Sequence, residues 1–333
     1  MNNAKNVEIT VLVTGVGAII GQGIIKSLRK ARHSVRVVGV DRNDNSPGPS
    51  FCDIFFKKPG CDENHPDYLA FWKQIVKDAK IDLVLPGLEI DVDFFDKHRA
   101  FFKQINVPIV INRQELIALS SDKWFLGDVL HRNGLPQIPS CIPDTWSEAV
   151  DVLGPPPLLL KPRIGNGSRG IVRLNDENDF IYWCGKTQGS WMLQRIVGTD
   201  IEEYTVGIFG FGNGISLDPI LFRRRLSSAG NTLQAEVVED SVIELATKAL
   251  TALFQPLGPT NYQFRKEGDT AYLLEINPRF SSSNSLRTAF GYNEVEMSID
   301  YFLMGNIPPT PKINQGIAWR YNEDFVIFDR HPV

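Results

Sequence analysis

The sequence predicts an α/β domain followed by regions of the α+β class, and three observations support this fold. Over residues 7–112, apolar runs typical of strands alternate with amphipathic helical stretches, a pattern that favours a parallel sheet covered on both faces. From residue 191 onward, runs of alternating polarity follow one another at hairpin-like spacing, which indicates an antiparallel sheet. The 333 residues are also enough for two or three domains.

The first region is expected to alternate strand and helix throughout. In chain order we expect a strand at 8–15, a helix at 18–31, a strand at 34–41, a helix at 66–80, a strand at 82–87, a helix near 91–104 and a strand at 107–112. Parallel strands need long crossover connections, and the intervening helices would supply them.

A second region begins at about residue 113. Residues 120–140 predict a capped helix that ends at Asn133-Gly134 and is followed by a strand bounded by prolines. Residues 155–174 predict two strands around a glycine-rich loop. A helix is expected after them, from about 176 to 187.

The third region begins at Trp191 and is expected to form the antiparallel sheet. Its strand-like runs are 191–198, 201–213, 214–226 and 233–239. A helix from about 240 to 254 and a hairpin around Gly268 and Asp269 follow them. We expect a closing helix near 294–304 and one more strand in the tail at 316–328.

Composition excludes several classes of protein. The net charge is 35 minus 39, or −4, which argues against a general nucleic-acid or membrane-surface role. Four cysteines without CxxC spacing suit a reducing cytosol and support neither zinc nor disulfides. Four glycines and Gln22 interrupt the apolar stretch 11–25, so it is neither a convincing signal peptide nor a membrane span. We therefore expect a soluble, cytoplasmic protein.

The most informative segment is 261–285, NYQFRKEGDTAYLLEINPRFSSSNS. Side chains two apart on a strand share a face, so we expect Glu275, Asn277 and Arg279 to project together. Gln263 can join them from the neighbouring strand. This set combines oxygen ligands suited to Mg²⁺ with a guanidinium suited to phosphate or carboxylate. The alternative is a polar strand end with no ligand.

The N-terminal turn TGVGAIIGQG has two interpretations. Gly15, Gly17 and Gly21 lie between a strand and a helix, and Asp41 ends the second strand where a dinucleotide site places its ribose carboxylate. This pattern favours a nicotinamide-binding domain. However, the spacing is GxGxxxG rather than GxGxxG, and the alternative is a Rossmann-like turn that supports packing. The later motifs favour the second interpretation.

A glycine-rich loop follows Lys161 and Arg163. It consists of Gly165, Asn166, Gly167, Ser168, Arg169 and Gly170. Three glycines let consecutive backbone N–H groups turn toward phosphate oxygens, and the flanking cations would neutralise charge. An ordinary glycine-rich hairpin is the alternative.

Two further segments carry weaker signals. The strand that runs into Gly198 can present the backbone of Ile196 and Val197 to a base edge, with a carboxylate shortly after it for ribose hydroxyls. An ordinary strand–turn–strand would look the same. Three consecutive arginines at 223–225 cannot all face a core, so they line an anion site or a solvated sheet face.

Together and in this order, these segments resemble the ATP-grasp superfamily. The likeness is to the carbamoyl-phosphate-synthase-like branch of stand-alone carboxylate–amine ligases and spans nearly the whole chain. The resemblance implies a Rossmann-like pre-ATP-grasp domain at 1–112, a lid subdomain at 113–190 and a large ATP-grasp subdomain with the metal site at 191–333.

The resemblance also implies roles for individual residues. Contacts to ATP would come from Lys123, Lys161, Gly165, Gly167, Ser168, Arg169, Gly170, Gln194, Arg195, Ile196, Val197, Glu203 and Leu274. Of these, Gln194 to Val197 would form the adenine hinge and Glu203 would bind ribose. The metal, Mg²⁺ or Mn²⁺, would be held by Gln263, Glu275 and Asn277. The catalytic arginines on the substrate side would be Arg279 and Arg225.

The implied activity is ATP-dependent ligation of a small carboxylate to an amine through an acyl phosphate, with no nucleic-acid or membrane partner. Gly207 departs from the family pattern, because relatives often carry an acidic residue there. A single ATP-grasp unit without an amidotransferase domain argues against carbamoyl phosphate synthesis itself. The rivals are an NAD(P)-dependent oxidoreductase or epimerase and a non-catalytic ATP-binding sensor. The resemblance also leaves a homodimer open.

Overall fold

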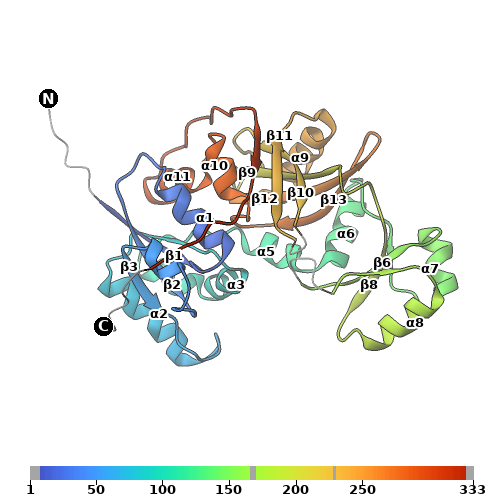
Figure 1. Cartoon of the computed structure of the whole chain (residues 1–333), viewed down its shortest axis with the longest axis horizontal. Coiled ribbons are helices and arrows are strands. Elements are labelled where there is room, and N and C mark those ends of the chain that lie inside the picture. The colour runs from blue at the N-terminus through green and yellow to red at the C-terminus, as the bar shows by residue number, and fades with distance from the viewer. Residues whose placement is uncertain (1–7, 166–169, 228–229, 328–333) are drawn as a thin grey trace.

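The N-terminal domain is built on a four-stranded parallel sheet. The computed structural model describes residues 8–165, 170–227 and 230–327 of the chain (Figure 1). The sheet order is β3-β2-β1-β4, with β1 at Ile9–Thr14, β2 at Val35–Asp41, β3 at Ile54–Lys57 and β4 at Leu83–Leu85. Every strand pair in it is parallel, as predicted. Its helices are α1 (Ile19–Leu28), α2 (Pro66–Asp78), α3 (Glu89–Lys97) and α4 (Arg99–Gln104), with a short 3-10 helix η1 at Gly48–Phe51.

Three details of this domain differ from the prediction. The short strand β3 was not expected. The helix expected near 91–104 is divided at His98 into α3 and α4. The segment 107–112, expected as a strand, makes only an isolated parallel bridge between Val84 and Ile109. Short edge elements such as these contain too few residues to establish a period in the sequence.

Two helices connect this domain to a small antiparallel sheet. They are α5 (Gln114–Ser121) and α6 (Lys123–Arg132), and the carboxylate of Asp122 caps α6 by accepting from Trp124 N at 3.0 Å. The sheet order is β5-β8-β6-β7, with β5 at Ser140–Cys141, β6 at Leu158–Pro162, β7 at Val172–Leu174 and β8 at Trp191–Arg195. The helices α7 (Trp146–Leu153) and α8 (Glu177–Lys186) pack on it.

The strand β8 belongs to the small sheet and not, as predicted, to the large one. Residues from Trp191 onward were assigned to the third region, but β8 pairs with β5 and β6 of the small sheet. Alternating polarity shows that a segment is a half-buried strand and does not show which sheet it joins. The chain therefore enters the large sheet only after Arg195.

The large sheet has six antiparallel strands in the order β13-β12-β9-β10-β11-β14. They are β9 (Glu203–Phe211), β10 (Ile220–Leu226), β11 (Thr232–Val237), β12 (Leu257–Glu267), β13 (Thr270–Asn277) and β14 (Ile317–Trp319). The helix α9 (Ser241–Phe254) covers one face with apolar side chains, as its period predicts. Of the tail strand predicted at 316–328, only the three residues of β14 form a strand, which pairs with β11.

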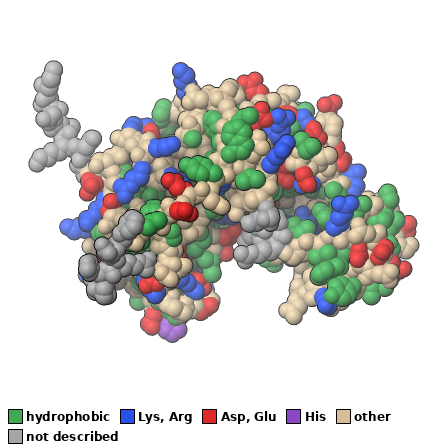
Figure 2. All heavy atoms as spheres, in the orientation of Figure 1, with side chains coloured by type: hydrophobic (Ala, Val, Ile, Leu, Met, Phe, Trp, Pro, Cys, Tyr) green, Lys and Arg blue, Asp and Glu red, His purple; other side chains and the backbone are tan. Residues whose placement is uncertain are grey.

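Short helices after the hairpin join the large sheet to the N-terminal domain. They are α10 (Asn284–Ala289), α11 (Glu294–Ser298) and the π-helix η2 (Ile299–Leu303). Val295 and Ile299 share one apolar core with Val11 and Val13 of β1. Among the described residues, no helix is long and apolar enough to cross a membrane. Figure 2 shows the lobe with the small sheet set apart from the main body by a hollow.

Candidate functional site

A cavity of about 480 Å³ lies between the small sheet and the large sheet. This volume is within the range of small-molecule sites. Residues from the small-sheet side that line it include Lys161, Gln194, Arg195, Ile196 and Val197. Those from the large sheet include Glu203, Arg224, Gln263, Arg265, Leu274 and Glu275. Lys123 and Gly165 complete the wall beside α6. The cavity therefore joins segments that are far apart in the sequence.

Most of the predicted nucleotide-binding, metal-binding and catalytic residues line this one cavity. The exceptions within the described chain are Gly170, Asn277, Arg279 and Arg225. Gly170 lies beyond it, against the ring of Pro162, with a φ of +73° that suits glycine. Gly167, Ser168 and Arg169 lie outside the described residues.

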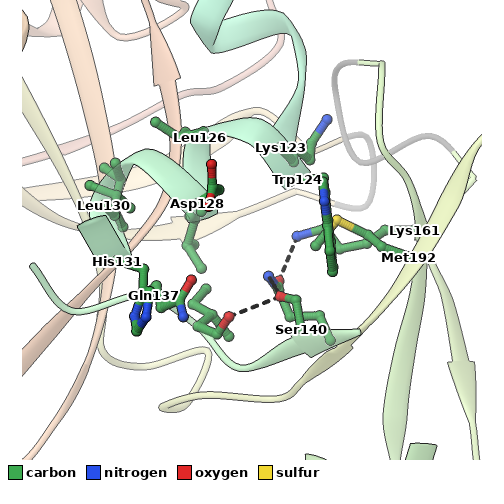
Figure 3. Close-up of a pocket in the computed structure, with 15 residues that line it drawn as sticks. Lys123, Trp124, Leu126, Asp128, Leu130, His131, Gln137, Ser140, Lys161 and Met192 are labelled. Atoms are coloured by element: carbon green, nitrogen blue, oxygen red, sulfur yellow. Dashed lines mark hydrogen bonds between the residues drawn. The ribbon is translucent and has the colours of Figure 1, made fainter. Parts of the chain in front are cut away.

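Lys161 is a buried cation that lacks a carboxylate partner among the described residues. The residue is 7% exposed, and within the described chain its Nζ donates to Gln194 Oε1 alone, at 2.8 Å. Gln194 Nε2 in turn donates to Ser140 Oγ at 2.9 Å (Figure 3). Burial, and then repulsion from Lys123, lowers the pKa of Lys161 to about 8, although Glu275 opposes the shift. An anionic ligand would supply the missing counter-charge.

A second cavity of about 220 Å³ continues behind this chain of hydrogen bonds. It shares Lys123, Lys161 and Gln194 with the larger cavity and extends toward Trp124 and His131 of α6 (Figure 3). Lys123 is the first residue of α6, and its Nζ donates to the carbonyl oxygen of Gly165. Burial lowers the pKa of Lys123 as well. Two amines whose pKa values are lowered by burial thus face the same space.

The hairpin places three of the predicted side chains next to one another. Gln263 of β12 is the register partner of Glu275 on β13. Glu275 Oε1 accepts hydrogen bonds from Gln263 Nε2 and, at 2.9 Å, from Asn277 Nδ2. Glu275 Oε2 and Asn277 Oδ1 make no hydrogen bond to the described part of the protein. These two oxygens are thus available to a cation.

The donor set at this hairpin fits Mg²⁺ and does not suit a metal that needs several protein ligands. Within residues 8–165, 170–227 and 230–327, no group of three or more His, Cys, Asp or Glu side chains is placed to hold an ion. Mg²⁺ usually takes one or two carboxylates and completes its octahedron with water and substrate phosphates. Glu275 with Asn277 matches that requirement, whereas the carbonyl oxygen of Gln263 is turned toward Arg224.

The arginine that faces the cavity is Arg224, whereas Arg225, which was predicted to act on the substrate side, does not line it. Along β10, Arg223 and Arg225 are exposed while Arg224 is buried, because alternate residues of a strand face opposite sides of the sheet. Arg224 contacts Glu203 at 2.9 Å. Arg225 lines a surface depression with Gln234 and Glu236 instead. The sequence shows the alternation, but not which arginine faces inward.

Glu203, predicted to bind ribose, lies at the floor of the cavity between two arginines. Its Oε1 accepts from Arg224, and its Oε2 contacts Arg265 at 3.1 Å. The side chain is almost fully buried. Two guanidinium groups therefore hold this carboxylate in one orientation.

Arg279 does not project with Glu275 as the sequence predicts. The strand ends at Asn277, and beyond it Arg279 turns toward the N-terminal domain, where Nη2 contacts Glu89 Oε2 at 3.0 Å. Both residues line a smaller cavity of about 110 Å³ with Asp93 of α3. Gly165 borders both this cavity and the large one, so the two spaces adjoin.

Neighbouring segments of the N-terminal domain cover its glycine turn. Gly17 N–H donates to Asp41 Oδ2 at 2.8 Å, so the carboxylate expected for a ribose contacts the turn itself. A Cβ at Gly48 would lie 2.8 Å from Gly17 N, which shows how closely η1 covers the turn. This packing favours the Rossmann-like turn without a dinucleotide.

Comparison with known proteins agrees with this architecture. Residues 191–325 match the family model described as ATP-grasp in the biosynthetic pathway with Ter operon, and residues 11–110 match the PylC-like N-terminal domain. A search of curated protein sequences returned no match.

Solved structures show the same fold over nearly the whole chain. The ADP complex of N5-carboxyaminoimidazole synthetase from Staphylococcus aureus is 17% identical with a TM-score of 0.71, and the alignment covers 94% of this chain and 81% of that one. Biotin carboxylase from Campylobacter jejuni is 16% identical, with a TM-score of 0.69 and coverage of 92% and 74%. The ATP complex of carboxyaminoimidazole ribonucleotide synthase from Aspergillus clavatus is 18% identical, with a TM-score of 0.68 and coverage of 93% and 81%. The fold is that of the ATP-grasp ligases.

Proposed function

The chain belongs to the ATP-grasp superfamily, and on this premise we propose that it is an ATP-dependent carboxylate–amine ligase of the carbamoyl-phosphate-synthase-like branch. The main support is the 480 Å³ cavity, in which the buried Lys161 of the small sheet and Lys123 of α6 face a hairpin carboxylate of the large sheet. A nucleotide with a divalent cation would complement both sides of the cavity. Its phosphates would pair with the ammonium groups, and its metal ion would bind the carboxylate of the hairpin.

The nucleotide would lie with its base against the hinge at 194–197. Lys161 and Lys123 would contact the phosphates, since both ammonium groups face the cavity and neither has a carboxylate hydrogen-bond partner among the described residues. Glu203, oriented by its two arginines, is the proposed ribose ligand. Leu274 lines the cavity wall beside Glu275.

Glu275 and Asn277 would hold Mg²⁺ or Mn²⁺. When bound, the cation neutralises charge on the β- and γ-phosphates and orients them. Glu275 Oε2 is the carboxylate oxygen proposed for this contact, because Oε1 already accepts two amide N–H groups.

The protein would activate a carboxylate by phosphorylation. A carboxylate resists attack by an amine because its leaving group would be oxide. Its oxygen therefore takes the γ-phosphoryl group of ATP, the bond to the β-phosphate oxygen breaks, and ADP leaves. The amine then attacks the acyl carbon, phosphate leaves and the amine loses a proton. Lys123 and Lys161 position the reactants and stabilise developing charge.

The smaller cavity beside Arg279 is the proposed place for the two organic substrates. Arg279 would bind the carboxylate, while Glu89 and Asp93 favour the cationic end of an amine or amino acid. Gly165 separates this space from the nucleotide cavity, so the acid would meet the γ-phosphate at their junction.

A screen for ADP release tests the proposal. Amino acids and small carboxylates are supplied in pairs with MgATP, and mass spectrometry detects the amide. We expect ADP and the amide to appear in equal amounts for at least one pair. ATP binding without ADP release for any pair would instead favour the nucleotide sensor.

The variant Glu275→Ala tests the metal site. We expect it to lose turnover by about 100-fold or more, because a main metal ligand is removed, while the fold is retained. Glu236→Ala is the control, since Glu236 of β11 pairs with Arg223 of β10 and does not line the cavity. Rates and circular dichroism are measured for both. Near-normal ligation by Glu275→Ala would contradict the metal assignment.

A further inference from the structure

We propose that Arg224 and Gln263 form a hydrogen-bond relay that positions Glu275, and that Gln263 serves as this bridge and not as a ligand of the cation. This inference rests on the proposed function, because it concerns how the hairpin receives a metal-bound nucleotide. It assigns a positioning role to Arg224, the middle one of three consecutive arginines on β10.

The orientation of Gln263 follows from the chemistry of its two partners. Its side-chain amide lies between Arg224 Nη2 and Glu275 Oε1. A guanidinium can only donate hydrogen bonds, and an ionised carboxylate can only accept them. The carbonyl oxygen of Gln263 must therefore face Arg224, and its NH₂ group must face Glu275. The reverse orientation would place donor against donor and acceptor against acceptor.

Arg224 is itself held so firmly that it can fix its partner. It is 5% exposed, and both Nε and Nη2 donate to Glu203 Oε1, at 3.2 and 2.9 Å. Nη1 lies 3.4 Å from Thr232 Oγ1. Glu203 is braced from its other side by Arg265. Removing a buried guanidinium from such a set leaves acceptors without partners, which is more costly than losing one exposed contact.

The relay determines which oxygen of Glu275 faces the cation. Gln263 and Asn277 both donate to Oε1, one from each side of the hairpin. Oε2 is left without a hydrogen bond from the described residues. The carboxylate of Glu275 is therefore oriented so that Oε2 is the oxygen left for a metal ion. The carbonyl oxygen of Gln263 already accepts a hydrogen bond from the guanidinium of Arg224.

The two possible roles of Gln263 predict opposite changes in Mg²⁺ affinity when Arg224 is replaced. If Gln263 were a metal ligand, Arg224→Met would free its oxygen and remove a nearby positive charge, so Mg²⁺ would bind more tightly. If Gln263 is a relay, the same variant misorients Glu275. We then expect Mg²⁺ affinity to fall by roughly tenfold, as for the loss of one charge-assisted hydrogen bond.

The experiment titrates Mg²⁺ at a concentration of a fluorescent ATP analogue that saturates each protein, with wild type, Arg224→Met, Gln263→Met and the double variant. Saturation keeps a weaker contact between Glu203 and the nucleotide out of the measured Mg²⁺ affinity. The relay predicts that Gln263→Met also weakens Mg²⁺ binding, and that adding it to Arg224→Met weakens it little further. Arg223→Met is the matched control, because this neighbour is exposed on the opposite face and pairs only with Glu236 among the described side chains. Tighter or unchanged Mg²⁺ binding by Arg224→Met would overturn the relay.

A metal-free measurement separates this inference from the proposed function. In EDTA, the same four proteins are melted without nucleotide. The relay predicts that the double variant loses less melting temperature than the sum of the losses in Arg224→Met and Gln263→Met. Additive effects would overturn it. If Arg224→Met does not fold, Arg224→Lys is used in its place. Lysine keeps the positive charge but lacks the several N–H donors of the guanidinium. Wild type that fails to bind MgATP would overturn the proposed function and leave this thermal test intact.

Discussion

Lys161 shows at the scale of one residue how burial creates a ligand site. The chain places an ammonium group in the cavity with a neutral amide as its hydrogen-bond partner. Such an arrangement disfavours the charged amine until an anion arrives. The pKa of Lys161 is therefore lowered by its surroundings, because a lysine in water would be fully charged at neutral pH.

The lowered pKa of Lys161 predicts pH-dependent nucleotide binding. With a pKa of about 8, the amine carries its charge below that pH and loses it as the pH rises through it. The affinity for an ATP analogue should therefore fall as the pH is raised from neutral to mildly alkaline values. Lys123, whose pKa is also lowered, acts in the same direction. Binding should also take up a proton near the middle of this range.

Fluorescence titrations over this pH range, with calorimetry in buffers of different ionisation enthalpy, measure both effects. Lys161→Gln is the matched variant, since it keeps a polar side chain without a titrating amine. Its binding should be weaker and should depend less on pH. An affinity of wild type that stays constant across the range would contradict the role given to Lys161.

At the scale of elements, the packing around Gly207 of β9 explains why this position lacks the acidic side chain that relatives often carry. A Cβ there would lie 2.5 Å from the guanidinium of Arg287, which is fully buried. Arg287 contacts Glu294 of α11 at 2.8 Å. The burial that raises the pKa of Glu294 is opposed by this arginine. Gly207 therefore leaves room for a buried ion pair that joins α10 to α11.

Gly207→Ala should destabilise the protein by about 2–4 kcal/mol, because Arg287 must move and leave Glu294 buried without its partner. Urea unfolding measures the change. Gly185→Ala is the control, since this glycine lies on α8 with open space around its Cβ position. That change should be neutral or stabilising by up to about 1 kcal/mol. Equal stability of the two variants would argue against the crowding at Gly207.

At the scale of the whole molecule, the proposed nucleotide site bridges two sheets. Its walls come from β6 and β8 on one side and from β9, β10, β12 and β13 on the other. The N-terminal domain reaches the same region through the pair of Glu89 and Arg279. A ligand that contacts both sheets stabilises their closed arrangement relative to the unfolded chain.

An ATP analogue with Mg²⁺ should therefore raise the melting temperature. At a concentration 100 times its Kd it adds about 2.7 kcal/mol, which corresponds to several degrees for a chain of this size. NADH should leave the melting temperature unchanged, because Asp41 and η1 close the N-terminal turn. Thermal shift assays compare the two. Stabilisation by NADH and not by the ATP analogue would favour the oxidoreductase alternative.

Much of the secondary structure could be predicted from periodicity. The apolar strands β1 and β2, the capped helix α6 and the hairpin of β12 and β13 all occur where the sequence places them. Elements with weak periods, such as β3 and α10, were not expected. Whether the limits 112 and 190 mark independent domains stays a prediction.

The sequence by itself determined the order of the motifs and the hairpin that carries Gln263 and Glu275, because these depend on local period and on one short turn. A register shift between Gln263 and Phe264, which the sequence does not show, sets Gln263 opposite Glu275. Only the tertiary structure decided that β8 joins the small sheet, that Arg224 faces the cavity and that Arg279 turns to Glu89. Alternation along a strand is symmetric between its two faces. Which face becomes the interior is settled by contacts between segments far apart in the chain.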